Sequence, residues 1–406
     1  MLVALFFVRT PTARAQSFIP LPTGPYIVGR ESMILRDASR TDPFSPRAND
    51  VRRLAVLIWY PAAPRRGGSP LMPPRPGERA DFTASLLGFA RISQSQGETR
   101  PLSVILQGLR ALQPNVFEDL DPRRDGPFPL VIMSHGLGSM PEEYDSLAED
   151  LASRGMIVVG VNHTYASFVS MYLPGRPTYN APDLNQVRFD LQPQAGSAIS
   201  DQWVQDLRFV LDQMLRFNSQ RSNFWFHRID STRVAAMGHS MGGSASTGLA
   251  FTDSRVSCAI NLDGSLWGQT LAAHPNKPVM FVQSEGSTFE DLPEIPGDDL
   301  LAALGVTREQ YAAGRAFAIA SNAGVVNQSI AGGCWVRIAG AVHTAFTDFA
   351  LIGAADGGTI DPTRLRTLLR SYISAFLREQ LFGTRAGILR APSPDFPEVT
   401  VVRSAP

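Results

Sequence analysis

An apolar, strand-like run that leads directly into Gly-x-Ser-x-Gly is the feature that most constrains the fold of this chain. Residues 234–237 form that run, Gly238-His239-Ser240-Met241-Gly242 follows, and small residues typical of a buried helix come next. A strand that turns so abruptly into a helix strains the serine backbone and leaves no room for side chains two positions away. Gly238 and Gly242 meet this demand. The sequence therefore predicts a nucleophile elbow with an exposed Ser240 hydroxyl.

Alternating strand and helix signals continue through most of the chain and predict an α/β fold, with a mostly parallel sheet between helices. Apolar, β-type runs predict strands at 54–60, 129–133, 156–161, 233–237, 256–262, 278–282 and 335–338. Apolar residues at three- and four-residue spacing predict helices at 142–153, 203–217 and 365–381.

We expect one domain, residues 22–382. Two segments within it, at about 61–117 and 286–330, do not follow the alternating pattern and are interpreted as insertions. The second insertion is expected to be irregular, and residues 383–406, rich in proline, a loosely attached C-terminal tail. Apolar clusters between residues 82 and 112 predict either a flap that contacts a lipid surface or a pair of helices that pack on the sheet.

The first residues resemble an export signal. An apolar run spans 1–8, and Ala13-Arg14-Ala15 fits a small-residue cleavage site. The run is too short to cross a bilayer. We expect residues 1–15 to be part of a signal peptide and the protein to be secreted or periplasmic; a frayed apolar N-terminus is the alternative.

The balance of charge excludes one class of partner. The chain has 406 residues, with 37 basic and 37 acidic side chains. No net field attracts nucleic acid or an anionic membrane surface, so no nucleic-acid partner is expected, and no protein partner is predicted. The two cysteines, Cys258 and Cys334, fall on strands that another strand is expected to separate, which favours two buried thiols over a disulfide.

A serine nucleophile needs a histidine base and an orienting carboxylate, which follow it along the chain in this kind of fold. Of the six histidines, His274 and His343 follow Ser240. His274 lies in a polar loop before a strand, whereas His343 follows the last apolar strand, where a loop can reach the nucleophile. We therefore favour His343 as the base.

Two acidic residues qualify as the orienting carboxylate, and residue-level reasoning separates neither. Asp263 and Glu285 each end a strand after the elbow and each precedes a glycine. Ligands and catalytic groups collect at the carboxyl ends of parallel strands. A carboxylate before glycine is also ordinary turn chemistry, which explains one of the two.

Stabilisation of a tetrahedral intermediate requires two backbone N–H groups near the nucleophile. One is expected from Met241, the residue after the serine. The other is expected from the loop Ser134-His135-Gly136-Leu137-Gly138, whose glycines let the backbone bend toward the elbow. We assign it to the Leu137 amide.

Six segments, taken in their order along the chain, form one further pattern. They are 23–29, 58–62, Ser134–Gly138, Gly238–Gly243, Leu262-Asp263-Gly264 and Val-His-x-x-Phe-x-Asp-Phe at 342–349. Together they resemble the platelet-activating factor acetylhydrolase family, α/β-hydrolase phospholipases that remove short or oxidised sn-2 acyl groups. The resemblance covers about residues 22–382. It implies Ser240 as nucleophile, Asp263 rather than Glu285 as acid, His343 as base, oxyanion amides from Leu137 and Met241, and neither metal nor cofactor.

The chain departs from that family pattern near the substrate. Met241 stands where the family often has phenylalanine, and His135, Trp267 and Phe346 are candidate pocket residues. The expected activity is a serine carboxylic ester hydrolase acting on small-molecule or lipid esters, with phospholipid sn-2 esters favoured. The alternatives are a generic carboxylesterase, a polyester or cutin-type hydrolase, and a binding protein that keeps the fold without turnover.

Overall fold

The structure is a computed structural model, and it describes residues 19–64, 112, 114–118, 120–167, 169–173, 176–179, 193–273, 277–285, 294–304, 306–330, 333–353 and 358–403. The expected signal peptide at 1–15, and nearly all of the apolar clusters between 82 and 112, lie outside these residues. The domain limits and the lipid-contact expectation stay predictions.

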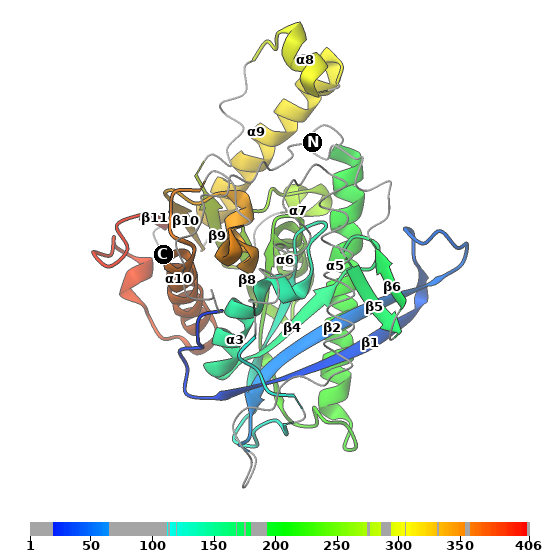
Figure 1. The fold of residues 1–406 in the computed structure, drawn as a ribbon, viewed down its shortest axis with the longest axis vertical. Coiled ribbons are helices and arrows are strands. Elements are labelled where there is room, and N and C mark those ends of the chain that lie inside the picture. Colours follow the sequence, from blue (N-terminus) through cyan, green and yellow to red (C-terminus); the bar gives the residue numbers. More distant parts are fainter. Residues whose placement is uncertain are drawn as a thin grey trace.

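A nine-stranded sheet forms the centre of the described part of the chain (Figure 1). Its strands are β1 (Ile27–Thr41), β2 (Val51–Ala62), β3 (Phe128–Ser134), β4 (Ile157–Asn162), β7 (Ile229–His239), β8 (Val256–Leu262), β9 (Val279–Ser284), β10 (Cys334–Ile338) and β11 (Val399–Arg403). Their order across the sheet is β1-β2-β4-β3-β7-β8-β9-β10-β11. Strands β4 to β10 in that order are parallel to one another, and β1, β2 and β11 complete the two sides through antiparallel pairing.

Helices cover both faces of this sheet. The main ones are α3 (Asp145–Ser153), α5 (Pro193–Ser219), α6 (Met241–Thr252), α7 (Gly268–Ala272), α8 (Asp298–Leu304), α9 (Arg308–Ile330) and α10 (Pro362–Phe382). Short 3-10 helices run over Pro141–Tyr144, His343–Phe346, Asp348–Ile352 and Gly387–Leu389, and β5 (Val169–Leu173) pairs with β6 (Arg176–Tyr179) in a separate hairpin.

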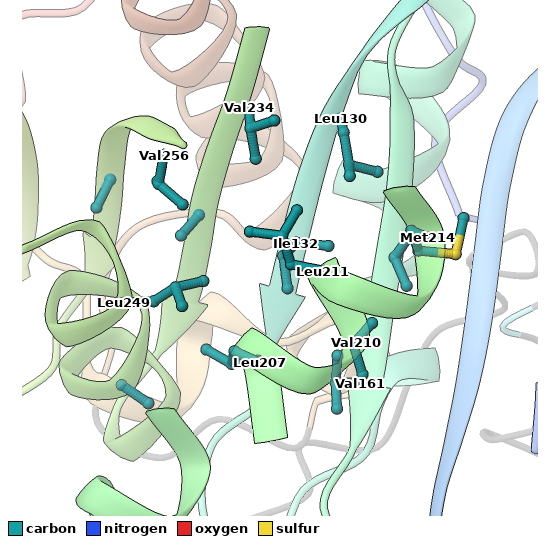
Figure 2. Close-up of a cluster of buried hydrophobic side chains, with 14 of the residues drawn as sticks. Leu130, Ile132, Val161, Leu207, Val210, Leu211, Met214, Val234, Leu249 and Val256 are labelled. Carbon is teal, nitrogen blue, oxygen red and sulfur yellow. The ribbon is translucent and has the colours of Figure 1, made fainter. Parts of the chain in front are cut away.

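Alternate side chains of the central strands enter two different cores. Leu130 and Ile132 of β3 pack with α5 and α6 on one face, as Figure 2 shows for Leu207, Val210 and Leu249. Val131 and Met133 of the same strand pack with α3 and α10 on the other face. Residues buried on both sides explain why the parallel strands read as continuous apolar runs.

The predicted α/β fold and its parallel sheet are confirmed. Each predicted strand coincides with or overlaps one of β2, β3, β4, β7, β8, β9 and β10, and each predicted helix overlaps α3, α5 or α10. No helix among the described residues is long and apolar enough to span a membrane.

Two expectations were wrong. The stretch 286–330 was expected to be irregular, but it contains α8 and the long α9, which rises from the sheet toward α8 at the top of Figure 1. The segment 383–406 was expected to be a loose tail, but its residues Val399–Arg403 form β11 and pair with β10 along five positions from Cys334↔Arg403 to Ile338↔Val399.

Candidate active site

The predicted elbow lies between β7 and α6. Ser240 has φ 55° and ψ −124°, and its N–H donates to the Leu262 carbonyl over 2.8 Å. A Cβ on Gly238 would lie 2.2 Å from the Gly242 carbonyl oxygen, and a Cβ on Gly242 would lie 2.3 Å from the His135 carbonyl oxygen. Side chains essentially never come so close, so both positions require glycine.

His343 approaches the serine from the loop that follows β10. Its Nε2 lies 3.0 Å from Ser240 Oγ, within hydrogen-bond reach for a proton transfer. The imidazole is half exposed. The other predicted candidate, His274, lies outside the described residues.

Asp263 follows β8 and meets the opposite side of the imidazole. Its Oδ2 lies 2.7 Å from His343 Nδ1, and it also accepts hydrogen bonds from the Ser284 amide and hydroxyl at 2.8 and 2.7 Å. Burial by itself would raise the pKa of the Asp263 carboxyl, but the hydrogen bonds from His343 and Ser284 outweigh it and lower the pKa below its usual value. The carboxylate is therefore ionised and able to fix the imidazole with its Nδ1 proton toward Asp263.

Glu285 occupies a different place. Its Oε2 accepts from the Gly340 amide over 2.6 Å, and its own amide donates to the Ala341 carbonyl over 3.0 Å. Glu285 thus anchors the loop that leads to His343, whereas Asp263 touches the imidazole itself.

The loop after β3 lies directly against the elbow. A Cβ on Gly136 would be only 3.4 Å from the Ser240 Cβ. Within the described residues, neither the Leu137 nor the Met241 amide has an acceptor, while the neighbouring Gly136, Gly138 and Ser139 amides all donate hydrogen bonds. Two spare N–H groups beside a serine are what an oxyanion hole requires.

All three candidate pocket residues are buried, and two of them have almost no exposed surface for a substrate. His135 is 1% exposed and Phe346 is 2% exposed. Phe346 belongs to the core under α10. Trp267 is 7% exposed and packs on Phe317 of α9, with ring centroids 4.3 Å apart.

His135 supports the loop from beneath. Its Nδ1 donates to the Gly136 carbonyl over 2.6 Å, and its Nε2 accepts from the His163 amide over 3.1 Å and lies 2.7 Å from the Ser167 hydroxyl oxygen. Burial lowers the pKa of its imidazole well below the usual range, which keeps the ring neutral.

Behind the same loop lies a buried network of hydrogen bonds and one ion pair that sequence reasoning missed. Ser134 Oγ bonds His163 Nε2 at 2.9 Å, His163 Nδ1 bonds Asp206 at 2.9 Å, and Arg52 pairs with Asp206 at 2.5 Å. Burial would raise the pKa of Asp206, but Arg52 and His163 hold it well below its usual value. In the sequence these side chains stand out only as polar residues within apolar elements. No spacing rule predicts contacts between elements so far apart in sequence.

A second missed support holds the His343 loop. Arg366 of α10 donates to the carbonyls of Ala345 and Phe346 and pairs with Asp348 at 3.2 Å. Asp348 in turn accepts from the Ser146 amide of α3 over 2.7 Å. One buried ion pair therefore ties the loop to both helices of this face.

Within the described residues, no group of three or more His, Cys, Asp or Glu side chains is arranged to hold a metal ion. Cys258 and Cys334 carry buried thiols on β8 and β10 with β9 between them, and they form no disulfide. Burial raises the pKa of the Cys258 thiol to about 12, so it stays protonated.

Comparison with known proteins identifies the family of this chain. The sequence model of platelet-activating factor acetylhydrolase, isoform II, matches residues 12–189 and 210–381. The chain belongs to the platelet-activating factor acetylhydrolase family. The match extends across both faces of the sheet and includes the elbow, the Asp263 turn and the His343 loop.

Three relatives give the likeness its scale. A probable 1-alkyl-2-acetylglycerophosphocholine esterase of Arthroderma benhamiae is 24% identical, over 94% of this chain and 92% of its own length. The platelet-activating factor acetylhydrolase of Gallus gallus is 23% identical, over 63% of this chain and 62% of its own length. Among solved structures, a ferulic acid esterase from Streptomyces cinnamoneus superposes with a TM-score of 0.67 at 27% identity, covering 95% of this chain and 99% of the esterase. The chain is thus an ester hydrolase with the α/β-hydrolase fold.

Proposed function

We propose that this protein hydrolyses short-chain or oxidised acyl esters, foremost at the sn-2 position of glycerophospholipids, through Ser240, His343 and Asp263. One observation carries the assignment of these residues. A continuous chain of hydrogen bonds runs from Ser240 Oγ through both nitrogens of His343 to Asp263, with heavy-atom distances of 3.0 and 2.7 Å.

In the first half of the reaction, His343 takes the Ser240 proton while Oγ attacks the ester carbonyl. The carbonyl oxygen becomes an oxyanion and accepts hydrogen bonds from the Leu137 and Met241 amides, which have no acceptor among the described residues. The imidazolium of His343, stabilised by ionised Asp263, then gives its proton to the leaving alkoxide. In a phospholipid this leaving group is the lysolipid.

In the second half, water replaces the alcohol. His343 takes a proton from that water, the hydroxide attacks the acyl carbonyl, and the same two amides hold the second oxyanion. Collapse returns the proton to Ser240 Oγ and releases the carboxylic acid. Every step uses groups of this chain, and the half exposure of His343 gives water access to it.

The substrate class rests on the family. One relative is named a probable 1-alkyl-2-acetylglycerophosphocholine esterase and another a platelet-activating factor acetylhydrolase, and the family match covers most of this chain. From these names we propose a lipid ester as the substrate of this protein. From the signal-like residues 1–15 we propose that it is exported. No protein partner, cofactor or metal is part of the proposal.

A generic carboxylesterase is the second candidate. It is favoured by the structural likeness to the ferulic acid esterase, whose name describes an ester that is not a phospholipid. Rates on phosphatidylcholines of graded sn-2 chain length, on methyl ferulate and on a polyester film separate these substrates. A higher kcat/KM for methyl ferulate than for a short sn-2 phospholipid would favour the second candidate.

The first prediction concerns the nucleophile. Ser240→Ala should lower kcat by about six orders of magnitude, because the serine, histidine and acid act as one unit. Hydrolysis of p-nitrophenyl acetate measures this, and a fluorophosphonate probe should label the parent and leave Ser240→Ala unlabelled.

The matched control is Ser231→Ala, an exposed serine at the opposite end of the same strand. It should keep parental turnover and labelling. Turnover by Ser240→Ala within tenfold of the parent would overturn the role of Ser240, and a folded parent that the probe does not label would favour a non-catalytic binding protein.

A further inference from the structure

Two buried side chains that the mechanism does not use connect the loop after β3 with the His343 loop. His239, the residue before the nucleophile, is 5% exposed, and Tyr144, at the end of the first 3-10 helix, is 3% exposed. The Tyr144 hydroxyl lies 2.8 Å from His239 Nδ1 and 3.1 Å from the Gly136 amide nitrogen. On its other side, His239 Nε2 lies 3.1 Å from the backbone carbonyl oxygen of His343.

The acceptors fix the direction of this chain of hydrogen bonds. A backbone carbonyl only accepts, so His239 carries its proton on Nε2 and donates to His343. Burial first, and the nearby His343 second, lower the pKa of His239 to about 3, so Nδ1 is bare at neutral pH. Tyr144 therefore donates to Nδ1, and its oxygen accepts from the Gly136 amide.

Gly136 is held at both of its backbone groups. Its N–H donates to Tyr144, and its carbonyl accepts from His135 Nδ1 at 2.6 Å and from the Ser139 amide at 3.0 Å. In a trans peptide the C=O and the next N–H point in opposite directions. A fixed Gly136 carbonyl consequently fixes the direction of the Leu137 N–H.

We propose that Tyr144 and His239 are positioning residues, which hold the Leu137 amide and the His343 imidazole in their places beside Ser240. This inference rests on the proposed function. The pair joins three segments that the reaction needs together: the loop after β3, the elbow and the loop after β10. Neither side chain touches the reacting atoms. The neutral His239 ring, 4.7 Å from the His343 ring, also adds no charge repulsion when His343 becomes protonated.

The test compares Tyr144→Phe, His239→Phe, the double variant and His239→Gln with the parent. Kinetics on p-nitrophenyl acetate are normalised to active sites titrated with the fluorophosphonate. Tyr144→Phe should lower kcat about tenfold, the loss of one buried hydrogen bond. His239→Phe should lower kcat about a hundredfold, the scale of a misplaced catalytic group. KM should change less than about twofold in both, since the interaction acts in the transition state.

Two further results separate positioning from a merely structural role. The double variant should fall no further than His239→Phe, because both changes break the same chain. His239→Gln, whose amide N–H can still donate to the His343 carbonyl, should recover about fivefold or more of the activity lost in His239→Phe.

Tyr372→Phe is the matched control. Tyr372 belongs to the same hydrophobic core as Tyr144 and is 1% exposed, and its hydroxyl has no partner among the described residues. It should keep parental kcat. If Tyr144→Phe matches this control, if the losses of the two single variants multiply, or if KM rises while kcat holds, the inference is wrong. A parent that neither turns over esters nor reacts with the fluorophosphonate overturns the proposed function, and the inference with it.

Discussion

Ser240 and Asp263 share an uncommon backbone conformation, with φ of 55° and 54°. Each lies immediately after a strand of the sheet, and positive φ at residues with a side chain costs about 1–3 kcal/mol. The backbone pays this cost where hydrogen bonds hold it, since the Ser240 amide donates to Leu262 at 2.8 Å and the Asp263 amide donates to Val282 at 2.7 Å. The strain aims both side chains at one edge of the sheet, where His343 lies between them.

Asp263→Asn should lower kcat by about four orders of magnitude, because an amide no longer holds the imidazole in the productive tautomer. Glu285→Gln is the matched comparison, since its amide oxygen can still accept from Gly340. That variant should stay within about threefold of the parent, as a hydrogen bond is retained. Steady-state hydrolysis of p-nitrophenyl acetate measures both. Equal losses in the two variants would contradict the assignment of Asp263.

At the residue scale, the sequence predicted the serine and the histidine from spacing and chain order alone. It could not separate Asp263 from Glu285, because both end a strand and precede a glycine; the resemblance chose Asp263, and the contact with His343 agrees. His135 was placed in a pocket from its neighbours in sequence. Burial beneath the loop depends on residues such as Ser167 that are remote from any motif.

At the element scale, α10 supports the His343 loop from one face of the sheet. Phe376, fully buried on this helix, belongs to the core that includes β3, β7 and β8. Phe376→Ala should lower the free energy of unfolding by about 3–5 kcal/mol, the cost of removing a buried aromatic ring.

Phe382, near the end of the same helix and 45% exposed, is the control. Phe382→Ala loses its contact with Arg233 and should cost about 1 kcal/mol or less. Chemical denaturation measures both variants. A loss in Phe376→Ala no larger than in Phe382→Ala would contradict the packing described for α10.

The elements that sequence reasoning missed have weak local signals. The buried side of α9 carries Tyr311, Ala318, Ser321 and Val325, a stripe too small and polar to stand out. β11 is short and follows a proline-rich segment, and its stability comes from pairing with β10, more than sixty residues earlier in the sequence. Strong apolar periodicity predicted the central strands, whereas these two elements depend on tertiary contacts.

At the scale of the whole molecule, the core on the α3 side contains several carboxyl groups. Burial raises the pKa of Glu143 from 4.5 to about 8 and that of Asp145 to about 7. Glu143 lies next to Tyr144, so its charge state bears on the stability of the fold around the site.

The raised pKa of Glu143 determines whether the free energy of unfolding rises or falls with pH. Below pH 4.5 this carboxyl is protonated in both states, so its contribution to stability is fully present. Between pH 4.5 and about 8 the unfolded chain releases the proton while the folded protein keeps it, and stability falls as pH rises. Between pH 5 and 8 the parent should lose up to about 4 kcal/mol relative to Glu143→Gln, at 1.36 kcal/mol per pKa unit.

Urea unfolding of the two proteins across that pH range measures the difference. The neutral Gln side chain removes the titration of this one group, and the other buried carboxyls are common to both proteins. A difference in unfolding free energy that does not change with pH would show that Glu143 is ionised in the folded state.

Because β11 pairs with β10, the last described strand of the chain covers the outer side of β10 and itself forms that edge of the sheet. The backbone carbonyl of Glu398, just before β11, accepts a hydrogen bond from the Ala339 amide at 2.9 Å. The Glu398 carboxylate accepts one from Arg364 of α10 at 2.5 Å. Proteolytic clipping in the proline-rich stretch before it would bare the hydrogen-bonding groups of β10 along its outer side. Bare strands recruit strands from other chains. Molecules that lose β11 after such a cut would therefore expose β10 as a new edge strand, which the intact enzyme keeps covered.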